Sequence, residues 1–281
     1  MAKLAQTAGL VGRVLRTLTI PVGSTLAVIA IWQAVVSWTD VSPLTLPTPS
    51  AVWQATVDNR DELSSAAWVT ASASLIAFGI SVVAGVVIAL ALSRSARLRR
   101  IFFPLIVALQ AAPKIAIAPL LVVWIGFGRE MAITIGIIVA IFPVIINATT
   151  GLTTVDSDVT MMARTMRASR NQMFLRVELP FALPHLFSGM KNCLVLSVVG
   201  VVIGELTGAN SGLGYVLLSQ SGQFQTAYAF AAMILLMLEG LVLFYILEGL
   251  ERRFAWYAHD AKRAQEAASE SPARARVRIA A

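Results

Sequence analysis

The chain has 281 residues, of which 57% are hydrophobic and only 13% are charged. This composition excludes an ordinary soluble domain and predicts an all-α polytopic membrane protein, because soluble domains carry roughly twice that charged share and the apolar runs reach about 20 residues, enough to cross a bilayer. The net charge of +7 does not indicate nucleic-acid binding, because the basic residues stand at the ends of apolar runs without interleaved aromatic residues.

Six membrane-spanning helices can be drawn through the apolar runs. They cover residues 18–38, 68–93, 101–127, 131–150, 184–207 and 227–250. The first run follows a basic N-terminus, as in a signal peptide, but it has no small-residue cleavage site, so we expect it to be retained as a span. The chain is thereby divided into a cytoplasmic N-terminus (1–17), a transmembrane domain (18–253) and a solvated, disordered tail (254–281).

The distribution of basic residues predicts the orientation of the spans. They occur in the N-terminus, the second loop, the fourth loop and the tail, at Lys3, Arg13, Arg16, Arg94, Arg97, Arg99, Arg100, Arg164, Arg167, Arg170, Arg176, Arg252 and Arg253. In a six-span chain all of these positions lie on one side of the membrane, whereas the opposite side holds Asp40, Asp58, Asp61 and Glu62 with only Arg60 and Arg129 as basic residues. The positive-inside rule therefore places both termini in the cytoplasm.

A stripe of small residues marks the second span. These residues recur at every fourth position, at Ala73, Ala77, Ser81, Gly85, Ala89 and Ser93. On a helix this spacing forms one face, along which a neighbouring backbone can approach closely. We interpret the stripe as a packing surface without chemistry.

A break is predicted in the third span. Pro113 and Pro119 flank Lys114 there, and each proline removes one helical hydrogen bond. Backbone groups freed at membrane depth are tolerated only where protein or a water-filled cavity covers them. The break therefore indicates a buried or cavity-lining segment.

Between the fourth and fifth spans, residues 155–184 predict a helical hairpin. Asp156 can cap a first short helix, whose apolar residues Val159, Met162 and Met166 recur at helical spacing. These methionines either contact a partner protein or pack against the protein's own span ends. The spacing alone favours neither interpretation.

A second short helix follows in the hairpin. Ser169 and Gln172 form a capping box at its start. We expect Pro180 to stop this helix and Pro184 to begin the next span, because proline cannot continue a helix but fits its first turn. The two helices would project from the membrane as a helix-turn-helix.

This hairpin resembles the cytoplasmic coupling loop of binding-protein-dependent ABC importer permeases. The family pattern is Glu-Ala-Ala, three residues, Gly, nine residues, Ile, one residue and Leu-Pro. Ala163 takes the third position and Val177 the Ile position. Leu179 and Pro180 form the terminal pair. The resemblance implies that an ATPase subunit docks on the segment formed by Met161, Met162, Ala163, Arg164, Thr165, Met166, Arg167, Ala168 and Ser169.

Three positions depart from the family pattern. Met161 and Met162 stand where the family has Glu and Ala, and Arg167 stands where it has Gly. The first change loses a charge that family members carry at the ATPase contact. The last one loses the residue that adopts a tight turn at the least cost.

Other segments extend the resemblance over about residues 46–253. They are LPTPSAVWQ, RLRRIFFPLIVALQAAPKIAIAPLLVVWIGFG, FPVIINATTGL, VIGELTGANSGLGYVL and FAAMILLMLEGLVLFYILEGLERR. Together they are similar to permeases that import nitrate, sulfonates, taurine, or pyrimidine and riboflavin-type precursors. The resemblance implies a MetI-like bundle of six transmembrane helices in a bacterial cytoplasmic membrane, with a coupling loop at about 155–183.

The family also implies the partners of the chain. These would be a second permease copy, two ABC ATPase subunits and an extracytoplasmic solute-binding protein, with membrane lipid around the bundle and no nucleic acid. ATP is expected on the partner subunit, because the sequence contains no glycine-lysine phosphate loop of the Walker type. We expect no enzyme activity, cofactor or metal on this chain, since Cys193 is its one cysteine and the two histidines, His185 and His259, are too few for a metal cluster.

We single out three ionisable residues within or near the spans, where charge is costly and usually faces a cavity or the bundle interior. Lys114 and Glu205 are the candidate residues of the translocation path, because one stands at the broken helix and the other beside the glycine-rich segment 208–216, which is expected to form an external turn or re-entrant segment. A structural salt bridge between them, or a snorkelling Lys114, is the alternative. Glu239 has no assigned role.

Two other classes of function remain open at the level of sequence. An ion-coupled secondary transporter or channel would use Lys114, Glu205 and Glu239 for ion coupling, and a membrane scaffold would need none of them. Association with an ATPase separates the importer from both.

Overall fold

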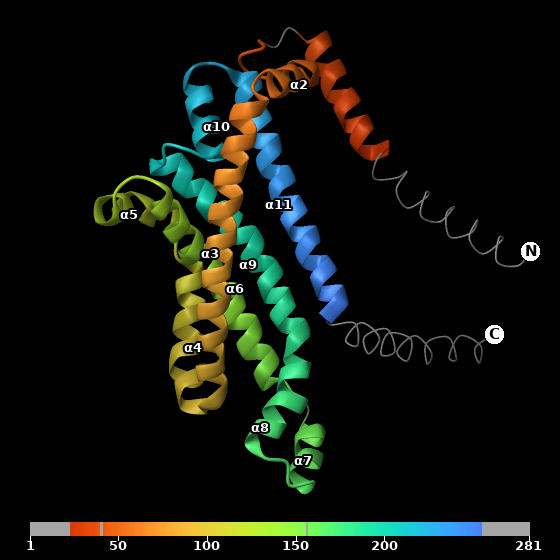
Figure 1. The fold of residues 1–281 in the computed structure, drawn as a ribbon, viewed down its shortest axis with the longest axis vertical. Coiled ribbons are helices and arrows are strands. Elements are labelled where there is room, and N and C mark those ends of the chain that lie inside the picture. The colour runs from red at the N-terminus through yellow and green to blue at the C-terminus, as the bar shows by residue number, and fades with distance from the viewer. Residues whose placement is uncertain (1–22, 40–41, 156, 255–281) are drawn as a thin grey trace, which may run out of the picture. The chain divides into compact units, whose positions relative to one another are not determined.

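The computed structural model describes residues 23–39, 42–155 and 157–254 (Figure 1). All regular elements in these described ranges are helices, which confirms the all-α prediction. They are a helix at Gly23–Trp38, α2 (Pro49–Asp58), α3 (Arg60–Arg94), α4 (Ala96–Ala111), η1 (Lys114–Ile117), α5 (Ala118–Ile125), α6 (Arg129–Thr153), α7 (Ser157–Thr165), α8 (Arg170–Met173), η2 (Phe174–Glu178), α9 (Leu179–Gly208), α10 (Leu213–Gly222) and α11 (Thr226–Phe254).

Four of these helices are long and apolar enough to cross a membrane: Arg60–Arg94, Arg129–Thr153, Arg170–Gly208 and Thr226–Arg253. A fifth span is formed if the bent pair Ala96–Ala111 and Lys114–Ile125 counts as one. The first predicted span, 18–38, falls partly outside the described residues, and its described part is a shorter apolar helix. The described residues therefore account for up to five of the six predicted spans.

The chain divides into two compact units. Of the described residues, the first contains those in 23–65 and Val216–Leu235, and the second contains those in Ala66–Tyr215 and 236–254. Within the first unit, α2 begins with Thr48 as its N-cap and Pro49 in its first turn. The hydroxyl of Thr226 donates to the carbonyl of Leu44 at 2.7 Å.

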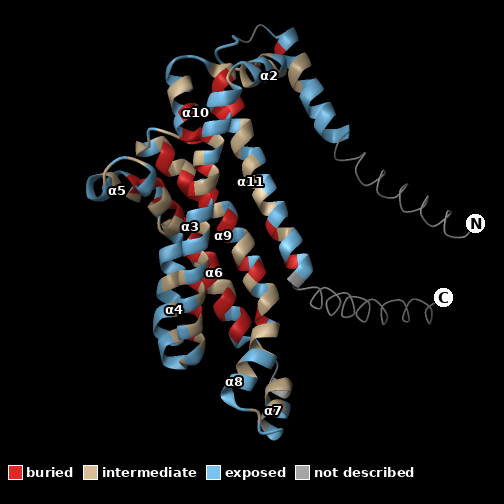
Figure 2. Cartoon of the chain, viewed as in Figure 1, coloured by how far each residue is buried: buried red, intermediate tan, exposed pale blue. Residues whose placement is uncertain are grey.

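In the second unit, α6 and α9 pack against each other along their length (Figure 1). Figure 2 shows that buried residues concentrate on these two helices. Small residues allow the close contact, since a β-carbon on Gly200 would stand 2.7 Å from the α-carbon of Gly136. In lipid such close backbone approach replaces the hydrophobic effect as the source of helix association.

The small-residue stripe of α3 is a packing surface, as predicted. Ala73, Ala77, Ser81 and Ala89 are all 1% exposed or less. Ala73 and Ala77 join α6 and α9 in one buried cluster. The stripe therefore contributes to the core of the second unit.

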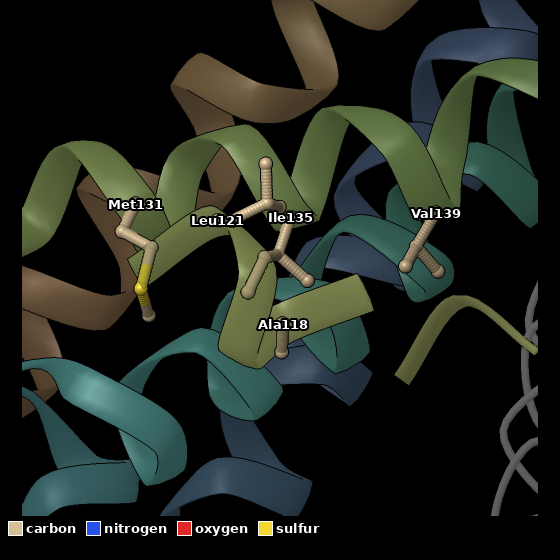
Figure 3. Packing of buried hydrophobic residues seen from close by; sticks show 5 residues of the cluster. All are labelled: Ala118, Leu121, Met131, Ile135 and Val139. Carbon is tan, nitrogen blue, oxygen red and sulfur yellow. The ribbon is translucent and has the colours of Figure 1, made fainter. Parts of the chain in front are cut away.

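The predicted break of the third span is also confirmed. The helix stops at Ala111, and the axis bends by 82° before the chain continues through η1 and α5. A buried cluster then fixes α5 against α6, formed by Ala118, Leu121, Met131, Ile135 and Val139 (Figure 3). Ala118, five residues after Pro113, is buried in this cluster, whereas Pro113 itself is exposed.

One prediction about the coupling hairpin was wrong. Pro180 does not stop the second helix, and Pro184 lies inside α9 instead of beginning it. The reason is a π-helical turn, η2, in which the Leu179 N–H donates to the Phe174 carbonyl, five residues earlier. This wider turn brings the helix past Pro180, which lacks an N–H and stands in the first turn of α9.

Candidate functional site

The coupling segment begins with α7 and its exposed methionines. Met162 and Met166 are 64% and 74% exposed, so they do not pack against the described span ends. They lie four residues apart and share one helix face. An exposed apolar pair of this kind is suited to a groove on another protein, and methionine adapts to irregular grooves.

The turn after α7 explains the glycine of the family pattern. Arg167 adopts φ of 55°, in the left-handed region that favours glycine. The N–H of Ala168 donates to the carbonyl of Ala163 at 3.1 Å, the hydrogen bond of a Schellman motif whose left-handed position is Arg167. This chain therefore forms the expected turn with arginine in the strained position.

The second helix of the hairpin starts as the sequence predicted. The Gln172 N–H donates to the Ser169 hydroxyl at 3.3 Å, and the Ser169 N–H donates to the Gln172 side-chain oxygen at 2.9 Å. The predicted cap of the first helix, Asp156, lies outside the described residues. From Arg170 the helix continues through η2 and α9 to Gly208, so the coupling segment is joined to a span without a flexible loop.

A residue that sequence reasoning missed supports this junction. The guanidinium of Arg94, at the end of α3, lies 4.8 Å from the centre of the Phe174 ring. Such a cation–π contact is worth about 0.5–1 kcal/mol at an exposed site. It links the C-terminal end of α3 to the π turn.

Lys114 lies beside a pocket between α4, α6 and α9. Its ammonium donates to the Gln110 carbonyl and stands 5.3 Å from the centre of the Phe142 ring. The pocket has a volume of about 370 Å³ and is lined by Gln110, Pro143, Ile146, Asn147, Asn192, Val195 and Leu196. Lys114 is not itself a lining residue, but its ammonium binds the carbonyl of Gln110, which is one.

Three side-chain amides line this pocket, and sequence reasoning singled out none of them. Gln110, Asn147 and Asn192 come from three helices. Asn147 donates to the Pro143 carbonyl at 2.8 Å, which leaves its side-chain oxygen available. The sequence feature that could have indicated them is the occurrence of amide side chains within apolar runs. Their grouping around one pocket, however, is visible only in the tertiary structure.

Glu205 has a different environment. The residue is 2% exposed, and its carboxylate accepts hydrogen bonds from the Thr70 hydroxyl, at 2.9 and 3.0 Å, and from the Gly214 N–H, at 2.8 Å. The Thr70 oxygen in turn accepts the Leu213 N–H at 2.8 Å. The carboxylate thereby ties the end of α9 to α3 and to the start of α10.

The backbone at Gly212 passes close to the Glu205 carboxylate. Gly212 adopts φ of 100°, and a β-carbon at this position would overlap the Glu205 carboxylate. The segment between α9 and α10 is thus a tight turn wrapped around one side chain, in agreement with the predicted turn at 208–216.

Lys114 and Glu205 are not partners. Among the described residues, the groups that contact each of them are different, and Glu205 is not part of the pocket lining. Their shared role in a translocation path stays a prediction, with the pocket favouring Lys114. Both carboxylate oxygens of Glu239 are buried without a hydrogen-bond partner among the described residues, and nothing in the structure explains this.

The sequence matches a family model described as binding-protein-dependent transport system inner membrane component, over residues 81–256. A probable ABC transporter permease protein of Haemophilus influenzae is 32% identical over 80% of this chain and 92% of its own length. The formylaminopyrimidine transport permease protein ThiX of Halalkalibacterium halodurans is 31% identical over 74% and 84%. The taurine transport system permease protein TauC of Escherichia coli is 29% identical over 86% and 91%.

The fold also has a counterpart among solved structures. An inward-facing form of the MetNI methionine ABC transporter contains a chain that matches with a TM-score of 0.59 and 21% identity. The match covers 71% of this chain and 97% of the other. At this identity the likeness concerns the fold alone.

Proposed function

This chain belongs to the family of binding-protein-dependent transport system inner membrane components, and we propose that two copies of it enclose the path of a small polar solute through a bacterial cytoplasmic membrane. As a member of this family, the chain is the permease subunit of an ABC importer. An ATPase and a solute-binding protein are its partners in transport.

The exposed methionine pair is the observation that carries the coupling role. Met162 and Met166 offer an apolar contact on α7, and α8, η2 and α9 connect this hairpin to a span without interruption. A push or pull by a partner on the hairpin would therefore act directly on α9. We propose that this partner is the ATPase and that ATP is hydrolysed there.

The proposed solute is an anion such as a sulfonate, taurine or nitrate, or a pyrimidine or riboflavin-type precursor. Relatives of this chain carry such names, among them the taurine and formylaminopyrimidine permeases above. The pocket supports a polar solute of this size, because amides from three helices line it and an ammonium group stands beside it. Amides donate and accept hydrogen bonds, so the pocket suits both chemical groups.

The proposed orientation places both termini and the hairpin in the cytoplasm, and Asp58 and Ser211 outside. It is supported by the one-sided distribution of arginines. Single-cysteine variants in a Cys193→Ser background, labelled in intact cells by a membrane-impermeant maleimide, test it. External labelling at position 170, or its absence at both 58 and 211, would contradict the orientation.

Reconstitution tests the function itself. The chain, its ATPase and its binding protein would be placed in liposomes, and ATP-dependent uptake of taurine, an alkanesulfonate, nitrate, formylaminopyrimidine and riboflavin would be measured. We expect uptake of one solute class that disappears when the phosphate-loop lysine of the ATPase is replaced. Uptake that persists without ATP hydrolysis and follows an ion gradient would instead identify a secondary transporter.

A further inference from the structure

A second pocket lies between the beginning of α4 and the end of α6. It has a volume of about 450 Å³ and is lined by Ala96, Arg99, Arg100, Phe103, Pro104, Thr149, Thr150 and Thr153. It shares no residue with the amide-lined pocket beside Lys114. From its chemistry we infer that it binds the phosphate group of an anionic phospholipid from the cytoplasmic leaflet.

The charge of the pocket points to an anion. The first turn of α4 has no acidic residue, and it carries arginines instead, although the helix N-terminus already has a partial positive charge of about +0.5. Among the described residues, Arg99 and Arg100 have no ion-pair partner. The C-terminus of α6 supplies a partial charge of only about −0.5, so the pocket keeps an excess of roughly two positive charges.

A buried hydroxyl gives an independent indication. Thr149 is 1% exposed and its hydroxyl has no hydrogen-bond partner in the described part of the chain. The hydroxyls of the other two threonines of the pocket do have acceptors. Thr150 donates to the Ile146 carbonyl and Thr153 donates to the Thr149 carbonyl, both at 2.8 Å. A buried donor without an acceptor is costly. Thr149 belongs to the pocket lining, so a phosphate oxygen that displaces the atoms covering this hydroxyl would supply the acceptor.

The apolar part of the lining favours a lipid over free phosphate. Phe103 and Pro104 follow Arg99 and Arg100 by one turn of α4, so the basic end of the pocket continues into an apolar wall. In the proposed orientation the basic end faces the cytoplasmic headgroups and the apolar wall faces the acyl region. Basic pockets between spans on this side are typical sites for anionic headgroups. The inference thus rests on the proposed orientation, but not on the identity of the solute.

Lipid binding by the full-length chain tests this inference without any transport measurement. The probe is dioleoylphosphatidylglycerol, compared with dioleoylphosphatidylcholine, and the readout is the dissociation constant from native mass spectrometry of the detergent-solubilised protein. We expect Arg99→Gln with Arg100→Gln to weaken phosphatidylglycerol binding by about tenfold or more, because two charge-assisted hydrogen bonds are lost. The matched control, Arg252→Gln with Arg253→Gln, removes equal charge at the same side of the membrane and should change binding less than about twofold.

Thr149→Val separates a loss of binding from a loss of folding. Valine has nearly the same shape and removes the unpaired hydroxyl, so this variant should melt at a higher temperature in phosphatidylcholine and still bind phosphatidylglycerol about threefold more weakly. Equal phosphatidylglycerol affinity in the wild type and the double glutamine variant would overturn the inference. So would full displacement of the lipid by millimolar inorganic phosphate, which would mark a site for soluble anions.

Discussion

The carboxylate of Glu205 occupies the space that a β-carbon on Gly212 would need. Gly212 also has a left-handed backbone conformation, with φ of 100°. Two independent constraints, a steric one and a conformational one, therefore require glycine at this position. Since Thr70 and Gly214 hold the carboxylate in place, it cannot move aside without losing its hydrogen bonds.

We predict that Gly212→Ala strongly destabilises the protein. The variant must either displace a buried carboxylate, at about 1–3 kcal/mol for each unsatisfied group, or distort the turn. The melting temperature in detergent should fall by more than about 5 °C. Gly79→Ala is the control, because a β-carbon there meets nothing within 4 Å, and it should be neutral or slightly stabilising, since alanine favours a helix over glycine. Equal melting temperatures for the two variants would refute the steric argument.

Features that depend on nearby residues could be predicted from the sequence, whereas contacts between distant residues could not. The Ser169–Gln172 capping box, the small-residue stripe and the proline break each depend on residues that are close together in the sequence. All three are observed. The contact of Glu205 with Thr70 joins residues far apart in the chain, so no local pattern contains it. Sequence reasoning found the carboxylate from its cost in lipid, but not the hydroxyl that stabilises it.

Pro180 shows a different limit. Proline normally ends a helix, and the prediction followed that rule. The rule failed because a π turn of five residues, Phe174–Glu178, rearranges the hydrogen bonds before the proline. Such turns have no simple sequence signature. As a result, α8, the second helix of the hairpin, forms one continuous helix with α9.

Arg167 yields a second prediction. Arg167→Gly should stabilise the hairpin by up to about 1 kcal/mol, because glycine adopts positive φ without a β-carbon penalty. Amide hydrogen exchange in residues 161–169 should therefore slow by up to about fivefold. Arg167→Ala is the control, because it removes the guanidinium but keeps the strain. If both variants exchange alike, the left-handed conformation is not the source of the effect.

Lys114 yields a third prediction, about the amide-lined pocket. Lys114→Met should lower the rate of solute uptake by about tenfold while the complex with the ATPase still assembles, because it removes a charge beside the cavity and keeps the length of the side chain. Asn192→Leu should also lower uptake, through loss of a hydrogen-bonding group from the lining. Lys114→Arg is the matched control and should retain most of the activity. Normal uptake by both Lys114→Met and Asn192→Leu would exclude this pocket from the path.

The coupling segment gives the last prediction. Replacing Met162 and Met166 together with aspartate should uncouple ATP hydrolysis from transport. Both side chains are exposed in the isolated chain, so the change is not expected to unfold it. In the complex, however, an apolar groove on the ATPase would have to bury two unpaired carboxylates, which costs several kcal/mol. A cost of that size weakens association by more than about a hundredfold.

Solute-stimulated ATP hydrolysis in liposomes and co-purification of the ATPase measure this effect. The double leucine variant is the control, since it keeps the apolar volume and should retain coupling. Met161 is apolar where the family pattern has glutamate, so the proposed docking would depend mainly on apolar contact. Full ATPase association and normal coupling in the double aspartate variant would show that the ATPase docks elsewhere, and the continuous helix from Arg170 to Gly208 would then have no part in coupling.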